Sequence, residues 1–149
     1  MYFVTGGAFN GKAEWVKGEL LRPDDISFQW HSHFRPEDVL LYPGLDTNQD
    51  IIVFEGLEYS ILHRLMDKTT NGEQLRKEFT NLFLAWMKWE QEKDKRLVIW
   101  IGSDITKGIV PLEEKNRLWR DISGWVYQDL AKISENVVSI WYGIPTTLK

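Results

Sequence analysis

A glycine-rich turn near the beginning of the chain constrains the fold more than any other feature. It follows the apolar run Tyr2-Phe3-Val4 and reads Gly6-Gly7-Ala8-Phe9-Asn10-Gly11-Lys12-Ala13, which has the GxxxxGK spacing of a phosphate-binding loop. Glycine permits backbone conformations in which successive N–H groups turn toward phosphate oxygens at the start of a helix, and Lys12 adds a positive charge for the β and γ phosphates. We therefore predict that this loop binds a nucleotide.

Ala13 departs from the usual form of this loop. The position after the lysine normally carries Ser or Thr, whose hydroxyl helps to hold Mg²⁺, whereas alanine offers no oxygen. The spacing also occurs by chance in ordinary strand–turn–helix segments, so its context matters. Here an apolar strand precedes the loop, and a segment of helical periodicity over residues 12–21 follows it. The sequence thus supports phosphate binding better than catalysis.

Strands and helices alternate along the rest of the chain. Apolar runs predict strands over residues 26–30, 51–54, 97–101 and 137–142, and helical periodicity predicts helices over 57–67, 73–92 and 112–133. This order is typical of a mostly parallel central sheet with helices on both faces. We expect an α/β, P-loop NTPase-like (RecA-like) fold in a single nucleotide-binding domain over residues 1–149.

Acidic residues follow two of the predicted strands. Glu55 ends the strand over 51–54, and Asp104 follows the strand over 97–101. Because ligands of open parallel sheets bind at the carboxyl ends of the strands, Glu55 and Asp104 are expected to lie near Lys12. The alternative is that each carboxylate only caps its strand or forms an ion pair, Glu55 with Lys12.

Histidines and tryptophans provide further candidate sites. His31 and His33 are two residues apart and could be metal ligands on one strand face, but no third ligand has suitable spacing, so a solvated pair is favoured. Trp86 and Trp89 could stack on a ligand. Since they lie in the apolar stripe of an amphipathic helix, a place in the core or in a subunit interface is favoured.

Composition limits the classes of partner. The net charge of −4 and the absence of a dense basic block argue against nucleic acid, and the absence of cysteine excludes disulfides and thiolate sites. No apolar run reaches the roughly 18–20 residues of a membrane span, and no signal-like segment is present, so we expect a cytoplasmic protein. Small molecules remain as partners, and eight tryptophans favour a homo-oligomer.

Four segments of the chain, taken in order, carry a resemblance to a known family. They are Thr5–Ala13, similar to TGGxxSGKS; Ile51–Glu58, similar to an apolar run followed by DCLT; Ser103–Pro111, similar to NEVGxGIVP; and Arg120–Ala131 with Gly143–Lys149, similar to RDxxGxxNQxxA and GLPxxLK. On these motifs the chain resembles the bifunctional adenosylcobinamide kinase/adenosylcobinamide-phosphate guanylyltransferase family of cobalamin biosynthesis, as a shortened and motif-divergent member.

The resemblance implies a phosphotransferase. It implies that GTP or ATP phosphorylates the side-chain hydroxyl of a corrinoid, cobinamide, with Mg²⁺ as cofactor. On this interpretation Lys12 and the loop amides bind phosphate, Glu55 holds Mg²⁺ through water, and Asp104 is the second candidate catalytic carboxylate. The resemblance also implies a homotrimer.

The family's guanylylated histidine, in a pattern similar to RIxxHxxxR, has no counterpart in this sequence. Neither His31 nor His33 can be assigned that role from the sequence, so we predict no guanylylated protein in the presence of GTP. The guanylyltransferase activity is therefore in doubt. The alternative function is a catalytically degenerate module that binds a nucleotide or a corrinoid without turnover.

Overall fold

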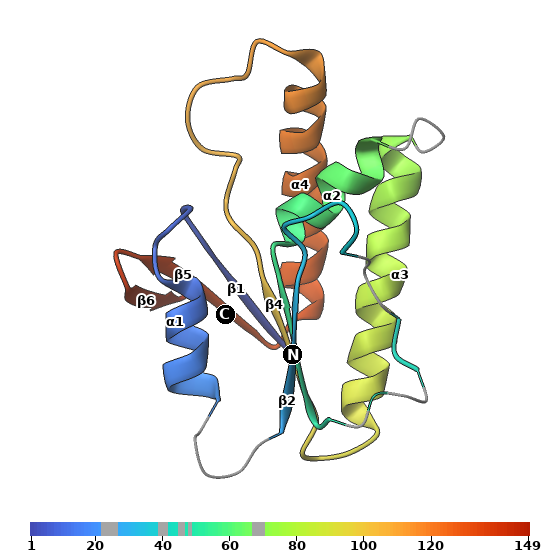
Figure 1. Cartoon of the computed structure of the whole chain (residues 1–149), viewed down its shortest axis with the longest axis vertical. Helices are drawn as coiled ribbons and strands as arrows, with labels where there is room; N and C mark the ends of the chain where they lie inside the picture. Colours follow the sequence, from blue (N-terminus) through green and yellow to red (C-terminus); the bar gives the residue numbers. More distant parts are fainter. Residues whose placement is uncertain (22–26, 39–41, 45–46, 48, 67–70) are drawn as a thin grey trace.

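A six-stranded sheet is the framework of the protein. The computed structural model describes residues 1–21, 27–38, 42–44, 47, 49–66 and 71–149. The strands are β1 (Tyr2–Gly6), β2 (Phe28–Ser32), β3 (Ile51–Glu55), β4 (Leu97–Ile101), β5 (Asn136–Trp141) and β6 (Ile144–Thr147), in the order β2-β3-β4-β1-β5-β6. All neighbouring strands are parallel except β5 and β6, which are antiparallel (Figure 1).

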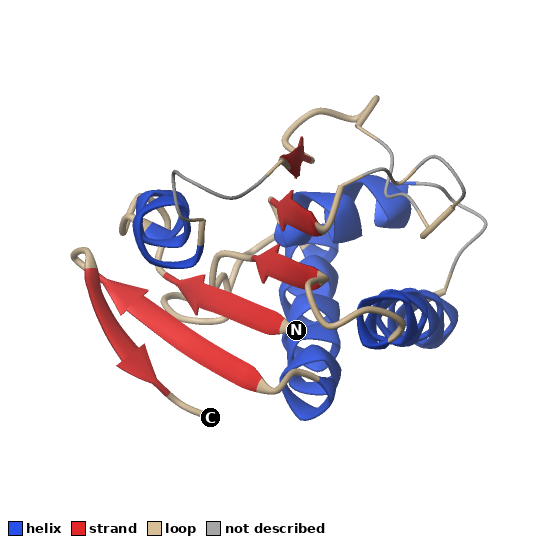
Figure 2. Ribbon diagram, turned by 90° about the horizontal axis from the view of Figure 1, so that it is seen from below, coloured by secondary structure: helices blue, strands red, loops and turns tan. Residues whose placement is uncertain are grey.

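Helices cover both faces of this sheet. The helix α1 (Lys12–Trp15), continued by a π-helical segment η1 (Val16–Leu20), lies on one face. On the other face lie α2 (Leu57–Met66), α3 (Gly72–Gln91) and α4 (Glu114–Ile133) (Figure 2). This arrangement confirms the α/β, P-loop NTPase-like fold with a mostly parallel sheet. Of the helices that the structure describes, none combines the length and the apolar character that crossing a membrane requires.

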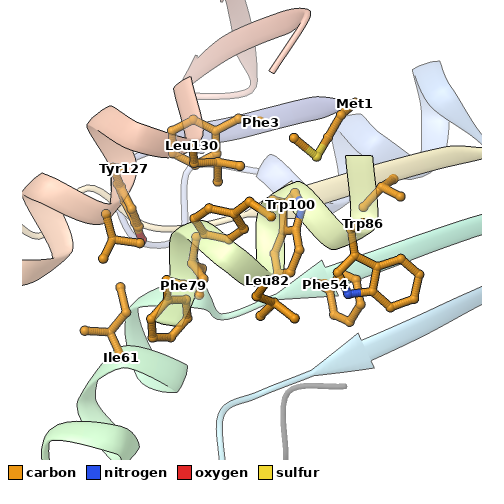
Figure 3. Close-up of a cluster of buried hydrophobic side chains, with 14 of the residues drawn as sticks. Met1, Phe3, Phe54, Ile61, Phe79, Leu82, Trp86, Trp100, Tyr127 and Leu130 are labelled. Carbon is orange, nitrogen blue, oxygen red and sulfur yellow. The ribbon is translucent and has the colours of Figure 1, made fainter. Parts of the chain in front are cut away.

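The two faces of the sheet carry separate hydrophobic clusters, because successive side chains of a strand point to opposite faces. The larger cluster lies under α2, α3 and α4. Phe54 and Trp100 stack in it with ring centroids 4.3 Å apart, and Trp86 packs edge-on against Phe54 at 5.0 Å (Figure 3). Trp86 and Trp89 are both buried in this cluster, which confirms that they belong to the core.

Local hydrogen bonds mark where the two long helices begin. The Asn71 side chain accepts a hydrogen bond from the Gln74 amide at 2.8 Å and so caps the N-terminus of α3. The helix α4 begins at Glu114, two residues after its predicted start at Leu112. The first helical backbone bond of α4 runs from the Arg117 amide to the Glu113 carbonyl at 3.1 Å, and the Arg117 guanidinium donates to the Leu112 carbonyl that precedes the helix.

The last strand was not predicted. The turn Tyr142-Gly143 has φ angles of 51° and 78°, the left-handed pair of a two-residue hairpin, and it returns the chain as β6 alongside β5. The strand predicted over 26–30 also lies later than expected, because β2 spans Phe28–Ser32, while residue 26 is outside the described residues. The strands β3, β4 and β5 match their predictions to within one residue, and β1 ends two residues after the predicted run Tyr2-Phe3-Val4.

The chain connections place β1 where the direction of winding changes. From β1 the chain crosses to the far edge at β2 and returns through β3 to β4, and α4 then carries it past β1 to β5. Backbone hydrogen bonds extend across the carboxyl ends of these strands, from Gly102 N to Val4 O (3.0 Å) and from Gly56 N to Ile101 O (3.1 Å). Ligand sites in parallel sheets form at such a point.

Candidate functional site

The glycine-rich loop connects β1 to α1 at this switch point. Gly6 has a φ of 139°, and a Cβ on it would lie 2.1 Å from the Ile140 carbonyl oxygen of β5, so only glycine fits there. Gly11, with a φ of 85°, precedes the first turn of α1. Phe9 adopts a φ of 56° and its side chain is fully exposed at the outer end of the loop. The loop backbone therefore surrounds the start of a helix, as the sequence predicted.

Lys12 lies inside this loop. Its ammonium group donates a hydrogen bond to the Gly7 carbonyl at 2.7 Å, and the residue is only 8% exposed. Burial lowers the pKa of Lys12, while the negative charges of Glu58 and Glu55 act in the opposite direction. The Lys12 ammonium forms no ion pair within 4.0 Å among the described residues, so its charge remains available to a phosphate.

Glu55 stands at the end of β3, two strands away from β1. One of its carboxylate oxygens accepts hydrogen bonds from the Trp30 indole at 2.9 Å and from the Ser32 hydroxyl at 3.3 Å. Both donors belong to β2, which runs parallel to β3 in register. The predicted alternative of an ion pair with Lys12 is therefore not what the structure shows; β2 holds the Glu55 carboxylate instead.

Glu58 is a pocket residue that the sequence reasoning did not single out. It lies in the first turn of α2 and is 3% exposed. Its Oε2 accepts hydrogen bonds from the Ser103 amide at 2.9 Å and from the Tyr127 hydroxyl at 3.3 Å, and its backbone carbonyl accepts one from the Trp119 indole at 2.7 Å. Its place three positions after Glu55, in the first turn of the predicted helix over 57–67, was the available signal.

A pocket of about 280 Å³ joins these groups. Its lining includes the loop from Ala8 to Ala13, Glu14, and the acidic residues Glu55 and Glu58. Three aromatic residues also line it, and in this group Tyr59 packs against Phe34 and Trp119 with ring centroids 5.6 Å and 6.1 Å apart. The structure thus brings a cation, two carboxylates and an apolar side together at the carboxyl end of the sheet.

Asp104 does not line this pocket, although its neighbours Ser103 and Ile105 do. Its Oδ1 accepts hydrogen bonds from the amide and the hydroxyl of Thr106, at 3.0 Å and 2.5 Å. Its Oδ2 lies 3.6 Å from the Lys107 ammonium. The Asp104 side chain is thus bonded within its own loop, while its backbone amide donates to the Gly6 carbonyl at 2.8 Å. Asp104 therefore lies beside the glycine-rich loop but does not line the pocket with Lys12 and Glu55.

The two histidines lie at the end of β2, outside the pocket. The His31 ring stacks on Phe54 with centroids 5.4 Å apart, and burial, followed by the His33 charge, lowers the pKa of His31. His33 is buried, and its Nδ1 lies 3.3 Å from the Glu55 carbonyl oxygen. The structure therefore makes this pair part of the packing and hydrogen bonding between β2 and β3, in place of the solvated pair that was predicted.

The β5–β6 hairpin supports the loop from outside the pocket. The Asn10 side-chain oxygen accepts the Tyr142 amide at 2.8 Å, and the Asn10 carbonyl accepts the Gly143 amide at 3.0 Å. The same side chain donates to the Ala8 carbonyl at 2.9 Å. The loop conformation is thus held by a segment more than a hundred positions away in the chain.

The pocket contains a carboxylate of the kind that Mg²⁺ uses as a ligand in a nucleotide site. Within the described ranges, no group of three or more His, Cys, Asp or Glu is placed to hold a metal by itself. Mg²⁺ bound with a nucleotide uses only one or two carboxylates, together with phosphate oxygens and waters. Glu55 lines the same pocket as the loop, so its carboxylate fits a metal that arrives with a nucleotide.

Comparison with known proteins identifies the family. No curated protein matches the sequence. The family profile described as "Cobinamide kinase / cobinamide phosphate guanyltransferase" matches residues 27–148, which begin after the glycine-rich loop and include β2 to β6. The two activities in that description are both group transfers. The match spans most of the chain, and the chain therefore belongs to the cobinamide kinase/cobinamide phosphate guanyltransferase family.

Proposed function

We propose that the protein is a kinase that transfers the γ-phosphoryl group of GTP or ATP to the side-chain hydroxyl of cobinamide. One observation carries this proposal: the buried Lys12 ammonium lies inside a loop that opens on a pocket containing Glu55 and Glu58. Phosphoryl transfer depends mainly on positioning and on charge stabilisation, and these are the groups that supply both.

Each part of the loop has a separate task in this proposal. The backbone N–H groups from Gly7 to Ala13 bind the phosphates, and Lys12 exchanges its bond to the Gly7 carbonyl for the β and γ oxygens. Glu55 would hold Mg²⁺ through water, its carboxylate kept in place by β2. The ion would neutralise charge on the phosphates during transfer.

The size of the pocket limits how cobinamide can bind. A volume of about 280 Å³ lies at the lower end of small-molecule sites, roughly 300–1,000 Å³, and a corrin macrocycle needs more space. We therefore propose that only the hydroxyl-bearing arm enters the pocket. The macrocycle then rests outside it, against the exposed rings of Phe34 and Tyr59.

Guanylyl transfer through a histidine is not part of the proposed function. The intermediate requires an imidazole that reaches the nucleotide, and none of the residues that line the pocket is a histidine. We expect no mass increase of one GMP when the intact protein is incubated with GTP and Mg²⁺. Observation of such an adduct would overturn this expectation, and peptide mapping would then identify the nucleophile.

A second candidate function is nucleotide or corrinoid binding without turnover. Ala13 favours it, because the loop lacks the hydroxyl oxygen that usually contacts Mg²⁺. The two functions differ in a simple way: a kinase consumes the nucleotide faster when cobinamide is present, whereas a binding module is stabilised by ligand and consumes none.

A thermal-shift titration with GTP and ATP, with and without Mg²⁺, tests nucleotide binding. A ligand at about 100 times its Kd stabilises the folded state by about 2.7 kcal/mol. For a domain of this size that corresponds to a rise in Tm of about 5–11 °C. We expect Lys12→Ala to abolish this rise and Lys17→Ala to retain it. Lys17 is a matched control, because it lies on the adjoining helical turn, exposed and paired with Glu14.

The outcomes of this titration separate the candidates. A rise that disappears only in Lys12→Ala places the nucleotide in the loop, and phosphorylation of cobinamide is then assayed directly. A rise without phosphorylation favours the binding module. No rise with either nucleotide refutes both nucleotide-dependent proposals.

Assembly as a homo-oligomer, a trimer by resemblance, is also proposed. It is supported by exposed apolar side chains on the loop after β4 and on the hairpin, among them Ile109, Leu112 and Ile144. Light scattering coupled to size-exclusion chromatography measures the mass directly, and the mass of one chain at micromolar concentration would refute it.

A further inference from the structure

Only one oxygen of the Glu58 carboxylate accepts hydrogen bonds from the described residues. Its Oε2 accepts hydrogen bonds from the Ser103 amide at 2.9 Å and the Tyr127 hydroxyl at 3.3 Å. Its Oε1 has no hydrogen-bond donor among the residues that the structure describes. Glu58 lines the pocket and its Oε1 is not among the fully buried atoms that lack a partner, so this acceptor oxygen is accessible to a ligand in the pocket.

Glu58 lines the same pocket as Lys12 and the loop. Because the lysine of a phosphate-binding loop contacts the β and γ phosphates, a nucleotide held by the loop would have its terminal phosphate in the pocket that Glu58 lines. Glu55 stands at the end of β3, where Trp30 and Ser32 donate to one of its oxygens, and the proposed function assigns it to Mg²⁺.

The other acidic residues near Glu58 have other partners or roles. Glu14 lines the pocket, but its carboxylate is exposed and paired with Lys17 at 3.1 Å, and Glu55 is assigned to Mg²⁺. Asp104 does not line the pocket and is bonded to Thr106, and no histidine lines it. The Tyr127 phenol is buried, and burial followed by the Glu58 charge raises its pKa well above the ordinary value, so it stays protonated and donates hydrogen bonds.

We propose that Glu58 is the general base of the phosphoryl transfer and accepts the proton of the acceptor hydroxyl on Oε1. This inference rests on the proposed kinase function. As the hydroxyl oxygen forms its bond to the γ phosphorus, its proton passes to Glu58, and the bond from the γ phosphorus to the β–γ bridging oxygen breaks. The nucleoside diphosphate leaves with that electron pair, and the protonated Glu58 later returns its proton to water.

The supporting contacts hold the base in the required place. The Ser103 amide fixes Oε2, so the carboxylate cannot rotate freely, and Oε1 keeps its direction. Gly102 leaves the space that the Tyr127 hydroxyl needs, because a Cβ at Gly102 would lie 2.3 Å from it. The Trp119 indole donates to the backbone carbonyl of Glu58 and so holds the first turn of α2. Strand β4 and helices α2 and α4 thus position one carboxylate.

The test compares Glu58→Gln with the wild type in a cobinamide phosphorylation assay. Glutamine keeps the size of the side chain and an oxygen for the Ser103 amide, but it does not accept a proton. We expect kcat to fall by about 100-fold or more, the size of a general-base contribution, while the Kd for the nucleotide changes less than about threefold. The acid limb of the kcat–pH profile should disappear, which a merely structural role would not produce.

Two further variants make the result decisive. Glu78→Gln is the control, because Glu78 of α3 pairs with Arg64 of α2, the helix that carries Glu58, but does not line the pocket; its kcat should equal that of the wild type. Glu58→Asp should retain the acid limb at a reduced rate, and it decides the question if the glutamine variant does not fold. A kcat within threefold of the wild type in Glu58→Gln, or an acid limb lost in Glu58→Asp, overturns the proposal. A wild-type protein that does not phosphorylate cobinamide overturns the kinase function itself.

Discussion

Replacing Gly6 by alanine should be far more damaging than the addition of a single methyl group suggests. The new Cβ would lie 2.1 Å from the Ile140 carbonyl oxygen, 3.0 Å from its carbon and 3.1 Å from its nitrogen, all of them backbone atoms of β5. Gly6 cannot move away, because its own carbonyl accepts the Asp104 amide at 2.8 Å on the other side. A φ of 139° is also one that L-residues rarely adopt.

The size of the effect follows from these contacts. An unfavourable φ costs about 1–3 kcal/mol, and separating β1 from β5 at this point leaves buried backbone groups unpaired at about 1–3 kcal/mol each. We expect the free energy of unfolding to fall by about 3–5 kcal/mol. This corresponds to a fall in Tm of about 6–20 °C for a domain of this size. Such a loss is exceptional for a single substitution of small volume.

The assay is urea denaturation followed by far-ultraviolet circular dichroism, with thermal denaturation beside it. Gly18→Ala is the matched control, because Gly18 is exposed, has no heavy atom within 4 Å of the added Cβ and has no positive φ. It should leave the stability unchanged or raise it by up to about 1 kcal/mol. If Gly6→Ala unfolds at the same urea concentration as Gly18→Ala, the close approach of β1 and β5 is wrong.

Three further predictions concern other parts of the molecule. Hydrogen bonds from Arg76 lower the pKa of Asp129, so the ion pair stabilises the fold above the unfolded-state pKa, and this stabilisation is lost as the pH falls through the lower folded-state pKa. The urea midpoint of Asp129→Asn should therefore lie below that of the wild type at pH 7, and the difference should shrink below about pH 4. A constant difference from pH 7 to pH 2 would contradict this prediction. Ala13→Ser should raise Mg²⁺-dependent turnover by supplying a hydroxyl oxygen, and unchanged turnover and nucleotide affinity would count against the proposed metal site. Asn10→Ala removes the oxygen that accepts the Tyr142 amide, a hydrogen bond that contributes about 1 kcal/mol to holding the loop in its conformation. If the nucleotide binds only to that conformation, calorimetry should show a Kd about fivefold higher. An unaltered Kd speaks against a role of the hairpin in nucleotide binding.

The strands and the long helices could be predicted because their signals are local. The runs at Ile51 and at Leu97 consist of apolar residues that are buried on both faces of a sheet, and the stripe of α3 recurs every three or four residues. Glycine spacing likewise places the loop after β1, because the left-handed and extended conformations it needs are available to glycine without strain. Periodicity identifies which side of an element is buried, and for these elements this was sufficient.

The composition of the pocket depended on contacts between distant segments. Asp104 and Glu58 are both acidic residues near the end of a strand. The Asp104 carboxylate bonds to Thr106 and does not line the pocket, whereas the Glu58 carboxylate accepts the Ser103 amide and the Tyr127 hydroxyl and does line it. The sequence could not rank them, because these partners lie up to 69 positions away and only the packing of α2 and α4 against the sheet brings them together.

By itself, the sequence determined the order of strands and helices as far as β5, the glycine-rich loop after β1 and the family, because each of these depends on short stretches of residue type and spacing. Only the tertiary structure decided which carboxylates share the pocket with Lys12, that β2 rather than Lys12 holds Glu55, and that the hairpin supports the loop through Asn10. The physical reason is that hydrogen bonds and charges act over a few ångströms in space, whatever the separation along the chain.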